Sequence, residues 1–294
     1  MILSFTNLSV RHPSATDAAL ALRDLNLSID QGEQIALIGP SGAGKTTLLH
    51  TLACALQPDE GGFTLFGHDP WRLSSAARHA MRTRLFLAPQ TPPLPPRQRV
   101  VSAVLAGLLP QWSVWQAIRS LVKPVDPVAA FNALARVNLQ DKLYARVDRL
   151  SGGERQRCGV ARLLISRADF FLVDEPLSAL DPTLSLQTLA VLQQEATARG
   201  ATLLCSLHQV ALARAHFPRI IGLRDGRIVF DAARDEVTDA MIDALYQSQG
   251  QSRGVGNDIQ SATGADPDMD SAQRDHQSPP AVPAPIPAAL TPRC

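Results

Sequence analysis

The feature that most constrains this chain is a glycine-rich segment between an apolar run and a helix-like run. Residues 39–47 read GPSGAGKTT and match the pattern G-x-x-x-x-G-K-[ST] at their first, sixth, seventh and eighth positions. The preceding QIALI at 34–38 is mostly apolar and bounded by glycines, as a buried parallel strand would be, and 46–56 carries a helical pattern. A strand that turns tightly into a helix aims backbone N–H groups at one point. The segment therefore predicts a phosphate-binding loop in an α/β fold.

Each residue type in this loop has a chemical reason. Glycines let the backbone N–H groups turn inward around phosphate oxygens, Lys45 reaches the β- and γ-phosphates, and the Thr46 hydroxyl suits a Mg²⁺ ligand. Lysine is otherwise rare, because the chain has only three lysines against 25 arginines. The residues expected to contact the nucleotide are Gly39, Pro40, Ser41, Gly42, Ala43, Gly44, Lys45, Thr46 and Thr47.

A second motif places two carboxylates at the end of an apolar run. Residues 170–176 read FFLVDEP, so a buried strand would carry Asp174 to the edge of the sheet where α/β proteins bind ligands. Asp174 can then support Mg²⁺, directly or through water, and Glu175 can orient the water that attacks the γ-phosphate. Alone, such a run is also typical of a solvated strand end. The phosphate loop upstream favours the catalytic interpretation.

A third motif, LSGGERQR at 150–157, lies directly before a helical run. Two glycines at a helix start, with a serine hydroxyl beside them, make a further backbone anion site, here formed by Ser151, Gly152, Gly153 and Glu154. This second site cannot easily serve the nucleotide of its own subunit. We therefore expect a homodimer in which each chain presents this segment to the nucleotide held by the other.

With these motifs the chain resembles the ATP-binding subunits of ABC transporters, whose signature is similar to LSGGERQR. Further family landmarks follow in order. Gln90 in LAPQ matches the Q-loop glutamine, Asp181 in SALD matches the D-loop, and His208 in SLHQV matches the switch histidine. The resemblance implies an ATPase whose catalytic residues are Lys45, Gln90, Glu175 and His208, and whose Mg²⁺ ligands are Thr46, Gln90 and Asp174.

The family usually places an aromatic residue, often tyrosine, shortly after the first strand, where it stacks on adenine. Here the matching position carries His12. The resemblance implies that the His12 imidazole takes this role, with less stacking area than a phenol ring.

The resemblance covers residues 1–247 and implies a P-loop ATPase core with a mainly parallel sheet, an antiparallel β subdomain and an inserted helical subdomain. The alternation of strand and helix patterns agrees with a largely parallel sheet. We expect an ATP-binding domain over 1–249, with the helical subdomain at about 91–150. The expected strands are 2–10, 21–29, 34–38, 63–66, 85–87, 170–173, 201–206 and 219–223, and the expected helices include 46–56, 153–167 and 183–199.

Residues 250–294 are rich in Gly, Ser, Gln, Asp, Pro and Ala. Such a composition cannot bury enough apolar area to offset its ordering entropy, so we expect a disordered tail. The alternative is a short peptide that docks on a partner.

Several segments are similar to phosphonate importer ATPases in particular, among them VLAG at 104–107, WQAIR at 115–119 and SLHQV at 206–210. The segment after Gln90, TPPLPPR at 91–97, departs from that family's usual sequence. The resemblance implies ATP hydrolysis that powers phosphonate uptake, with two permease subunits and, indirectly, a periplasmic solute-binding protein. It places the chain peripherally on the cytoplasmic face of the bacterial inner membrane. An importer of another small solute and an exporter remain alternatives.

Composition excludes other classes. A net charge of +1 argues against a dedicated nucleic-acid binder. No run of about 18 apolar residues and no secretory signal occur, so we expect a soluble chain that meets the membrane through a partner. The four cysteines are scattered without a CxxC pair, which argues against zinc. No long coiled-coil insertion or second ATPase domain is visible, unlike chromosome-structural and translation ATPases of this superfamily.

Overall fold

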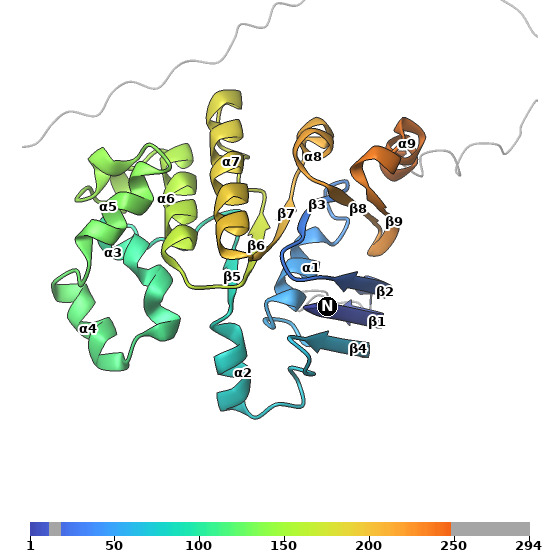
Figure 1. The fold of residues 1–294 in the computed structure, drawn as a ribbon, viewed down its shortest axis with the longest axis horizontal. Coiled ribbons are helices and arrows are strands. Elements are labelled where there is room, and N and C mark those ends of the chain that lie inside the picture. The colour runs from blue at the N-terminus through green and yellow to red at the C-terminus, as the bar shows by residue number, and fades with distance from the viewer. Residues whose placement is uncertain (12–18, 248–294) are drawn as a thin grey trace, which may run out of the picture. The chain divides into compact units, whose positions relative to one another are not determined.

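The computed structural model describes residues 1–11 and 19–247, which form two sheets with helices packed against them (Figure 1). Two expectations fall outside the described residues: His12 as the adenine-stacking residue, and the disordered tail at 250–294.

The larger sheet has the strand order β5-β6-β7-β3-β8-β9. The strands are β3 (Gln34–Ile38), β5 (Leu85–Ala88), β6 (Phe170–Asp174), β7 (Thr202–Ser206), β8 (Arg219–Arg224) and β9 (Arg227–Ala233). Neighbouring strands from β5 to β8 pair in parallel, and β9 pairs with β8 antiparallel. The carboxyl ends of β5, β6, β7 and β3 therefore meet at one edge.

Both faces of the sheet are buried along β3, β6, β7 and β8, which explains why these strands read as nearly continuous apolar runs. Side chains alternate along β3: Ala36 and Ile38 belong to one hydrophobic core, while Ile35 and Leu37 belong to the other. All five residues of β6 and of β7 are buried.

The smaller sheet is antiparallel, with the order β2-β1-β4. Its strands are β1 (Leu3–Arg11), β2 (Leu20–Ile29) and β4 (Glu60–Leu65). Phe5 and Phe63 face each other across β1 and β4 with ring centroids 4.9 Å apart in an edge-to-face arrangement. This sheet shares its apolar face with α1 and the core under β3.

The described helices are α1 (Lys45–Leu52), α2 (Ser75–Arg82), α3 (Val100–Leu105), α4 (Val114–Val122), α5 (Pro127–Ala135), α6 (Gly152–Ile165), α7 (Pro182–Arg199), α8 (Val210–His216) and α9 (Asp239–Tyr246). The helices α3 to α6 gather at one end of the larger sheet and form a helical group (Figure 1). The chain approaches α6 closely at Gly107, where a Cβ atom would lie 2.2 Å from the carbonyl oxygen of Arg162. No described helix is long and apolar enough to cross a bilayer.

The expected fold class is confirmed: a mainly parallel sheet, an antiparallel sheet and a helical group between β5 and β6. The helix expected at 46–56 is shorter, because α1 ends at Leu52 and Cys54 adopts a positive φ of 53° that no helix accepts. The helices α2, α8 and α9 and the strand β9 were not among the expected elements.

Candidate active site

The loop between β3 and α1 is held by close backbone approaches. Gly39 has φ +153°, and a Cβ atom there would lie 2.0 Å from the carbonyl oxygen of Leu223 on β8. Gly44 has φ +103°, and a Cβ atom there would lie 2.9 Å from the carbonyl oxygen of Ala21. Only glycine fits both positions, so the loop is fixed between β8 and β2 at the point where α1 begins.

Lys45 starts α1 and is 5% exposed. Its Nζ donates hydrogen bonds to the carbonyl oxygens of Gly39, at 2.8 Å, and Pro40, at 3.1 Å. Burial lowers the pKa of this amine, while the nearby carboxylates of Glu175 and Asp174 act in the opposite direction. The ammonium group is therefore anchored to the loop itself, and it lies near both carboxylates.

Asp174, at the end of β6, is 3% exposed and is hydrogen-bonded on both oxygens. Thr46 Oγ1 donates to its Oδ2 at 2.8 Å, and Ser206 Oγ donates to its Oδ1 at 2.6 Å. Adjacent ligands of an octahedral Mg²⁺ ion lie about 2.8–3.0 Å apart when each metal–oxygen bond is about 2.0–2.1 Å. The Thr46 and Asp174 oxygens have this spacing, so the donor set fits Mg²⁺.

Glu175 follows β6 and is contacted by residues from the two neighbouring strand ends. Gln90, after β5, donates from Nε2 to Glu175 Oε2 at 2.7 Å. His208, after β7, lies with Nε2 2.7 Å from Glu175 Oε1. The backbone of Glu175 has φ +46°, a value that residues other than glycine rarely adopt.

These groups share one cleft of about 450 Å³. Its lining comprises Ala21, Ser41, Gly42, Ala43, Gly44, Lys45, Thr46, Thr47, Gln90, Glu175 and His208. The structure thus brings together most of the loop and the three residues that follow β5, β6 and β7. Gly39 and Pro40 meet the cleft through the amine of Lys45, and Asp174 through the hydroxyl of Thr46.

The segment 151–154 contributes nothing to the described lining of this cleft. Ser151 is the N-cap of α6, where its Oγ accepts from Glu154 N at 3.1 Å and its N–H donates to Glu154 Oε2 at 2.8 Å. That backbone hydrogen bond holds the pKa of Glu154 below its ordinary value, with support from Lys142. A Cβ atom on Gly153 would lie 2.8 Å from the carbonyl oxygen of Ala179, so this segment packs on the loop after β6.

Asp181 also lies away from the cleft. It is the N-cap of α7, and its Oδ1 accepts from Leu184 N at 2.9 Å. Within one chain, the structure therefore gives Asp181 a helix-capping role and leaves Ser151 to Glu154 at a separate surface.

Ser206 is a residue of this site that the sequence reasoning missed. It is fully buried, and its Oγ accepts a hydrogen bond from Glu175 N at 2.9 Å while donating to Asp174. The signal was a serine closing the apolar run ATLLCS, next to His208. Only the pairing of β6 with β7 shows that this serine lies against the Asp174 carboxylate and the Glu175 N–H.

The ABC transporter family model matches residues 22–178. The chain is similar to "Phosphonates import ATP-binding protein PhnC 2" of Albidiferax ferrireducens, at 58% identity over 247 residues, which covers 84% of this chain and 89% of the relative. It is 54% identical to "Phosphonates import ATP-binding protein PhnC 2" of Pseudomonas aeruginosa over 249 residues, 85% of this chain and 92% of the relative.

Two solved structures share the fold. A dimeric structure of a bacterial ABC transporter cassette aligns with TM-score 0.68 at 23% identity, over 79% of this chain and 98% of that one. The ATP-binding subunit of an ABC transporter aligns with TM-score 0.67 at 21% identity, over 84% of this chain and all of that one.

Proposed function

Since this chain belongs to the ABC transporter family, we propose that it is the ATP-hydrolysing subunit of an importer for phosphonates. One observation carries the hydrolytic part: the Lys45 amine, the Thr46–Asp174 pair and the Glu175 carboxylate meet at one cleft formed by a phosphate loop and adjacent strand ends. The solute rests on the relatives, which are named as phosphonate import proteins and align over most of their length.

In the proposed reaction the loop N–H groups and Lys45 bind the phosphates of ATP. Thr46 and Asp174, with the amide oxygen of Gln90, would hold Mg²⁺. Bound there, the ion offsets negative charge on the phosphates. The loop donors and the amine are already fixed by the close approaches at Gly39 and Gly44. Little reorganisation is therefore needed when charge develops on the phosphoryl group.

Glu175 orients the attacking water and accepts its proton. A bond forms between the water oxygen and the γ-phosphorus, the bond from that phosphorus to the β–γ bridging oxygen breaks, and ADP and phosphate leave. Gln90 contacts one Glu175 oxygen and His208 contacts the other. Each carboxylate oxygen can accept a second hydrogen bond, so these contacts leave Glu175 able to bind the attacking water.

The position of Ser151 to Glu154 outside the cleft supports a head-to-tail homodimer, in which this segment of one copy faces the nucleotide of the other. The homodimer would bind two integral-membrane permease subunits and act with a periplasmic solute-binding protein, peripherally on the cytoplasmic face of the inner membrane. Gln90 lies between β5 and the helical group. This position supports a link between the occupied cleft and the permease contacts.

The first experiment tests the solute. A strain that lacks this chain, and any redundant phosphonate importer, is grown with a phosphonate as its sole phosphorus source, with and without the wild-type gene. We expect growth only with the wild-type gene. Normal growth of the deletion strain would leave the ATPase proposal standing and would favour an importer of another solute.

The Glu175→Gln variant tests the chemistry in the same strain and in the purified full chain. The amide keeps the shape of the side chain but cannot accept the proton. We expect ATP binding to persist while kcat falls by roughly 10²–10⁴. Complementation should then fail. Hydrolysis at the wild-type rate would remove Glu175 from the proposed role.

A further inference from the structure

One side chain of the helical group reaches into the segment that carries Glu175. Gln156 lies on α6 and is 5% exposed. Its Nε2 donates to the carbonyl oxygen of Glu175 at 2.7 Å and to Ser178 Oγ at 3.3 Å. Its Oε1 accepts from Ala179 N at 3.1 Å. The amide thus joins α6 to the peptide of Glu175 and to the loop beyond it.

The Glu175 peptide depends on such anchors. Its φ of +46° is sparsely populated by residues other than glycine and persists only where the surroundings hold it. The N–H of Glu175 is held by Ser206 Oγ on β7, and its carbonyl by Gln156 on α6. These two anchors hold the peptide planes on either side of the Glu175 Cα, so the carboxylate is aimed at Gln90 and His208.

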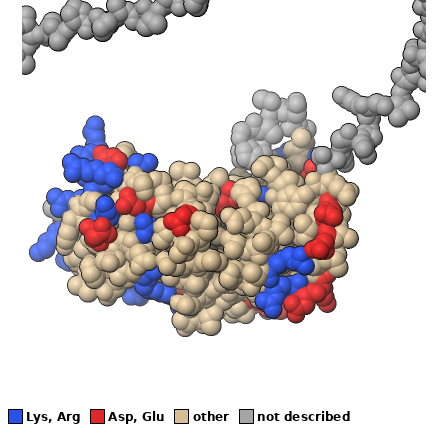
Figure 2. Space-filling view, turned by 90° about the horizontal axis from the view of Figure 1, so that it is seen from above, with Lys and Arg blue, Asp and Glu red and all other residues tan. Residues whose placement is uncertain are grey.

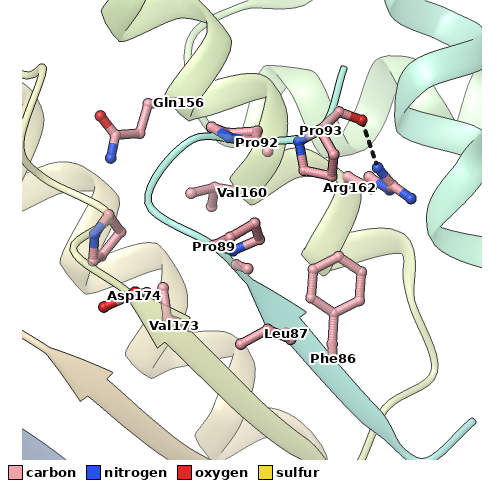
Figure 3. A pocket seen from close by; sticks show the side chains of 13 residues that line it. Phe86, Leu87, Pro89, Pro92, Pro93, Gln156, Val160, Arg162, Val173 and Asp174 are labelled. Carbon is pink, nitrogen blue, oxygen red and sulfur yellow. Dashed lines mark hydrogen bonds between the residues drawn. The ribbon is translucent and has the colours of Figure 1, made fainter. Parts of the chain in front are cut away.

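Gln156 supplies the shorter of two hydrogen bonds to the Glu175 carbonyl, which also accepts from Ser178 N at 3.4 Å. Gln156 borders a cavity of about 110 Å³ (Figure 3). Much of the lining consists of prolines and aliphatic groups, including Pro89, Pro92, Val160 and Val173. A Glu175 carbonyl that lost the amide would keep the long hydrogen bond from Ser178 N, and a weakly satisfied carbonyl holds the local backbone less firmly in a strained conformation.

Gln156 also shares its helix with Ser151. The two residues are five positions apart, about 7.5 Å along the axis of α6. A displacement of the Ser151 end of α6 therefore acts on the Glu175 carbonyl of the same chain through a single hydrogen bond.

We propose that Gln156 is a positioning residue for hydrolysis: it holds the strained Glu175 peptide and transmits the position of α6 to the Glu175 carboxylate. This inference rests on the proposed ATPase function. Gln156 is not among the residues that line the cleft, and it acts through Glu175.

Two variants of the purified full chain test the proposal. Gln156→Met removes the amide donor while keeping an unbranched side chain of similar length. We expect kcat for ATP hydrolysis to fall roughly 10-fold or more with KM changed less than about 2-fold, because binding does not use Gln156. Gln156→Glu keeps the acceptor for Ala179 N–H and loses the donor only when ionised. The fall in kcat of Gln156→Glu should therefore grow as pH rises. The fall in kcat of Gln156→Met, relative to the wild type, should not vary with pH.

Gln193→Glu is the matched control, because Gln193 Nε2 also donates to a backbone carbonyl at 2.7 Å, that of His216, far from the cleft lining. It should keep the wild-type kcat. In a Glu175→Gln background, Gln156→Met should cause no further loss, because its effect acts through the missing carboxylate.

Three results would overturn the proposal. The first is a folded, ATP-binding Gln156→Met variant with wild-type kcat. The others are a full additional fall in kcat when Gln156→Met is added to Glu175→Gln, and an equal fall in kcat in Gln193→Glu. If Gln156→Met does not fold, the pH dependence of Gln156→Glu decides, and a pH-independent ratio to the wild type counts against the proposal. A wild-type chain that does not hydrolyse ATP would instead refute the proposed function.

Discussion

The hydroxyl of Ser206 serves two groups at once, the Glu175 N–H and the Asp174 carboxylate, in a fully buried position. In Ser206→Ala the Glu175 N–H loses its partner, and the Asp174 carboxylate keeps the hydrogen bond from Thr46 but loses the one from Ser206. We expect the free energy of unfolding to fall by about 1–3 kcal/mol, measured by chemical denaturation. ATP hydrolysis should fall as well, because the Glu175 peptide loses one of its anchors.

Ser185→Ala is the control for this substitution. Ser185 is also buried, but its Oγ makes only one long hydrogen bond, 3.4 Å to the carbonyl oxygen of Leu180. We expect Ser185→Ala to lower the free energy of unfolding by less than about 1 kcal/mol. Equal destabilisation by both substitutions would mean that Ser206 has no special place in the site.

At this scale the sequence predicts residues whose roles are encoded in local motifs, such as Lys45 and Thr46 in the loop. It also predicts Glu175 as the residue that orients water and, through the family resemblance, His208 as the switch histidine; their contact with each other is a finding of the structure. Ser206 and Gln156 escape prediction because their contacts arise from the pairing of β7 with β6 and from the packing of α6. Neither the strand pairing nor the helix packing can be predicted from the residues next to Ser206 and Gln156 in the sequence.

The start of α6 is an element whose stability depends on pH. The Ser151 N–H and Lys142 favour the ionised Glu154 carboxylate, so its pKa is lowered in the folded chain. A lowered pKa stabilises the fold above the ordinary value of 4.5, and this contribution is lost as pH falls below it.

We therefore expect the wild type to be more stable than Glu154→Gln near pH 7, by up to about 1 kcal/mol, and the difference to shrink below about pH 4. Denaturation curves at several pH values measure it. Glu60→Gln, at an exposed position of β4, should change stability by less than about 0.5 kcal/mol. A difference for Glu154→Gln that is constant with pH would contradict the cap.

Elements with a strong period were predictable, and short ones were not. The bounds of β3 match the expectation, and β6 exceeds it by one residue, because continuous apolar runs flanked by glycine or acidic residues mark buried strands. In contrast, α2 and α9 have only eight residues each, and each has a single buried residue, Met81 and Leu245, so neither carries a long helical period that would reveal it. The early end of α1 depends on the local backbone at Cys54, which no motif signals.

The whole molecule presents two functional surfaces that a single copy does not join. The cleft carries Lys45, while Gly152 lies at the start of α6 outside the cleft lining. On the face of the described residues shown in Figure 2, basic and acidic side chains occur together without a continuous basic stripe, in keeping with the near-zero net charge.

Mixing two inactive variants tests whether copies combine head to tail. Lys45→Ala removes the loop amine. Gly152→Asp places a carboxylate toward the phosphates without a clash, because a Cβ atom there meets only Ala179 Cβ at 3.8 Å. In a mixed dimer one site has an intact loop and an intact partner segment. We expect ATPase activity to appear on mixing, at up to about a quarter of the wild-type value.

Each variant alone should remain inactive, and each should retain the unfolding transition of the wild type. A mixture as inactive as its components would contradict the head-to-tail arrangement. The cleft of one copy would then have to hydrolyse ATP without residues 151–154 of a partner.

The burial of Lys45 has a practical consequence for chemical labelling. The chain has only three lysine side chains. Lys123 is exposed at the end of α4 and Lys142 is partly exposed near Glu154. Lys45, in contrast, lies in the cleft, and burial lowers the pKa of its amine. An acylating reagent can therefore use Lys123 and Lys142 as internal standards. Bound nucleotide would protect Lys45 from the reagent, so mass spectrometry of the peptide that contains Lys45 can report nucleotide binding.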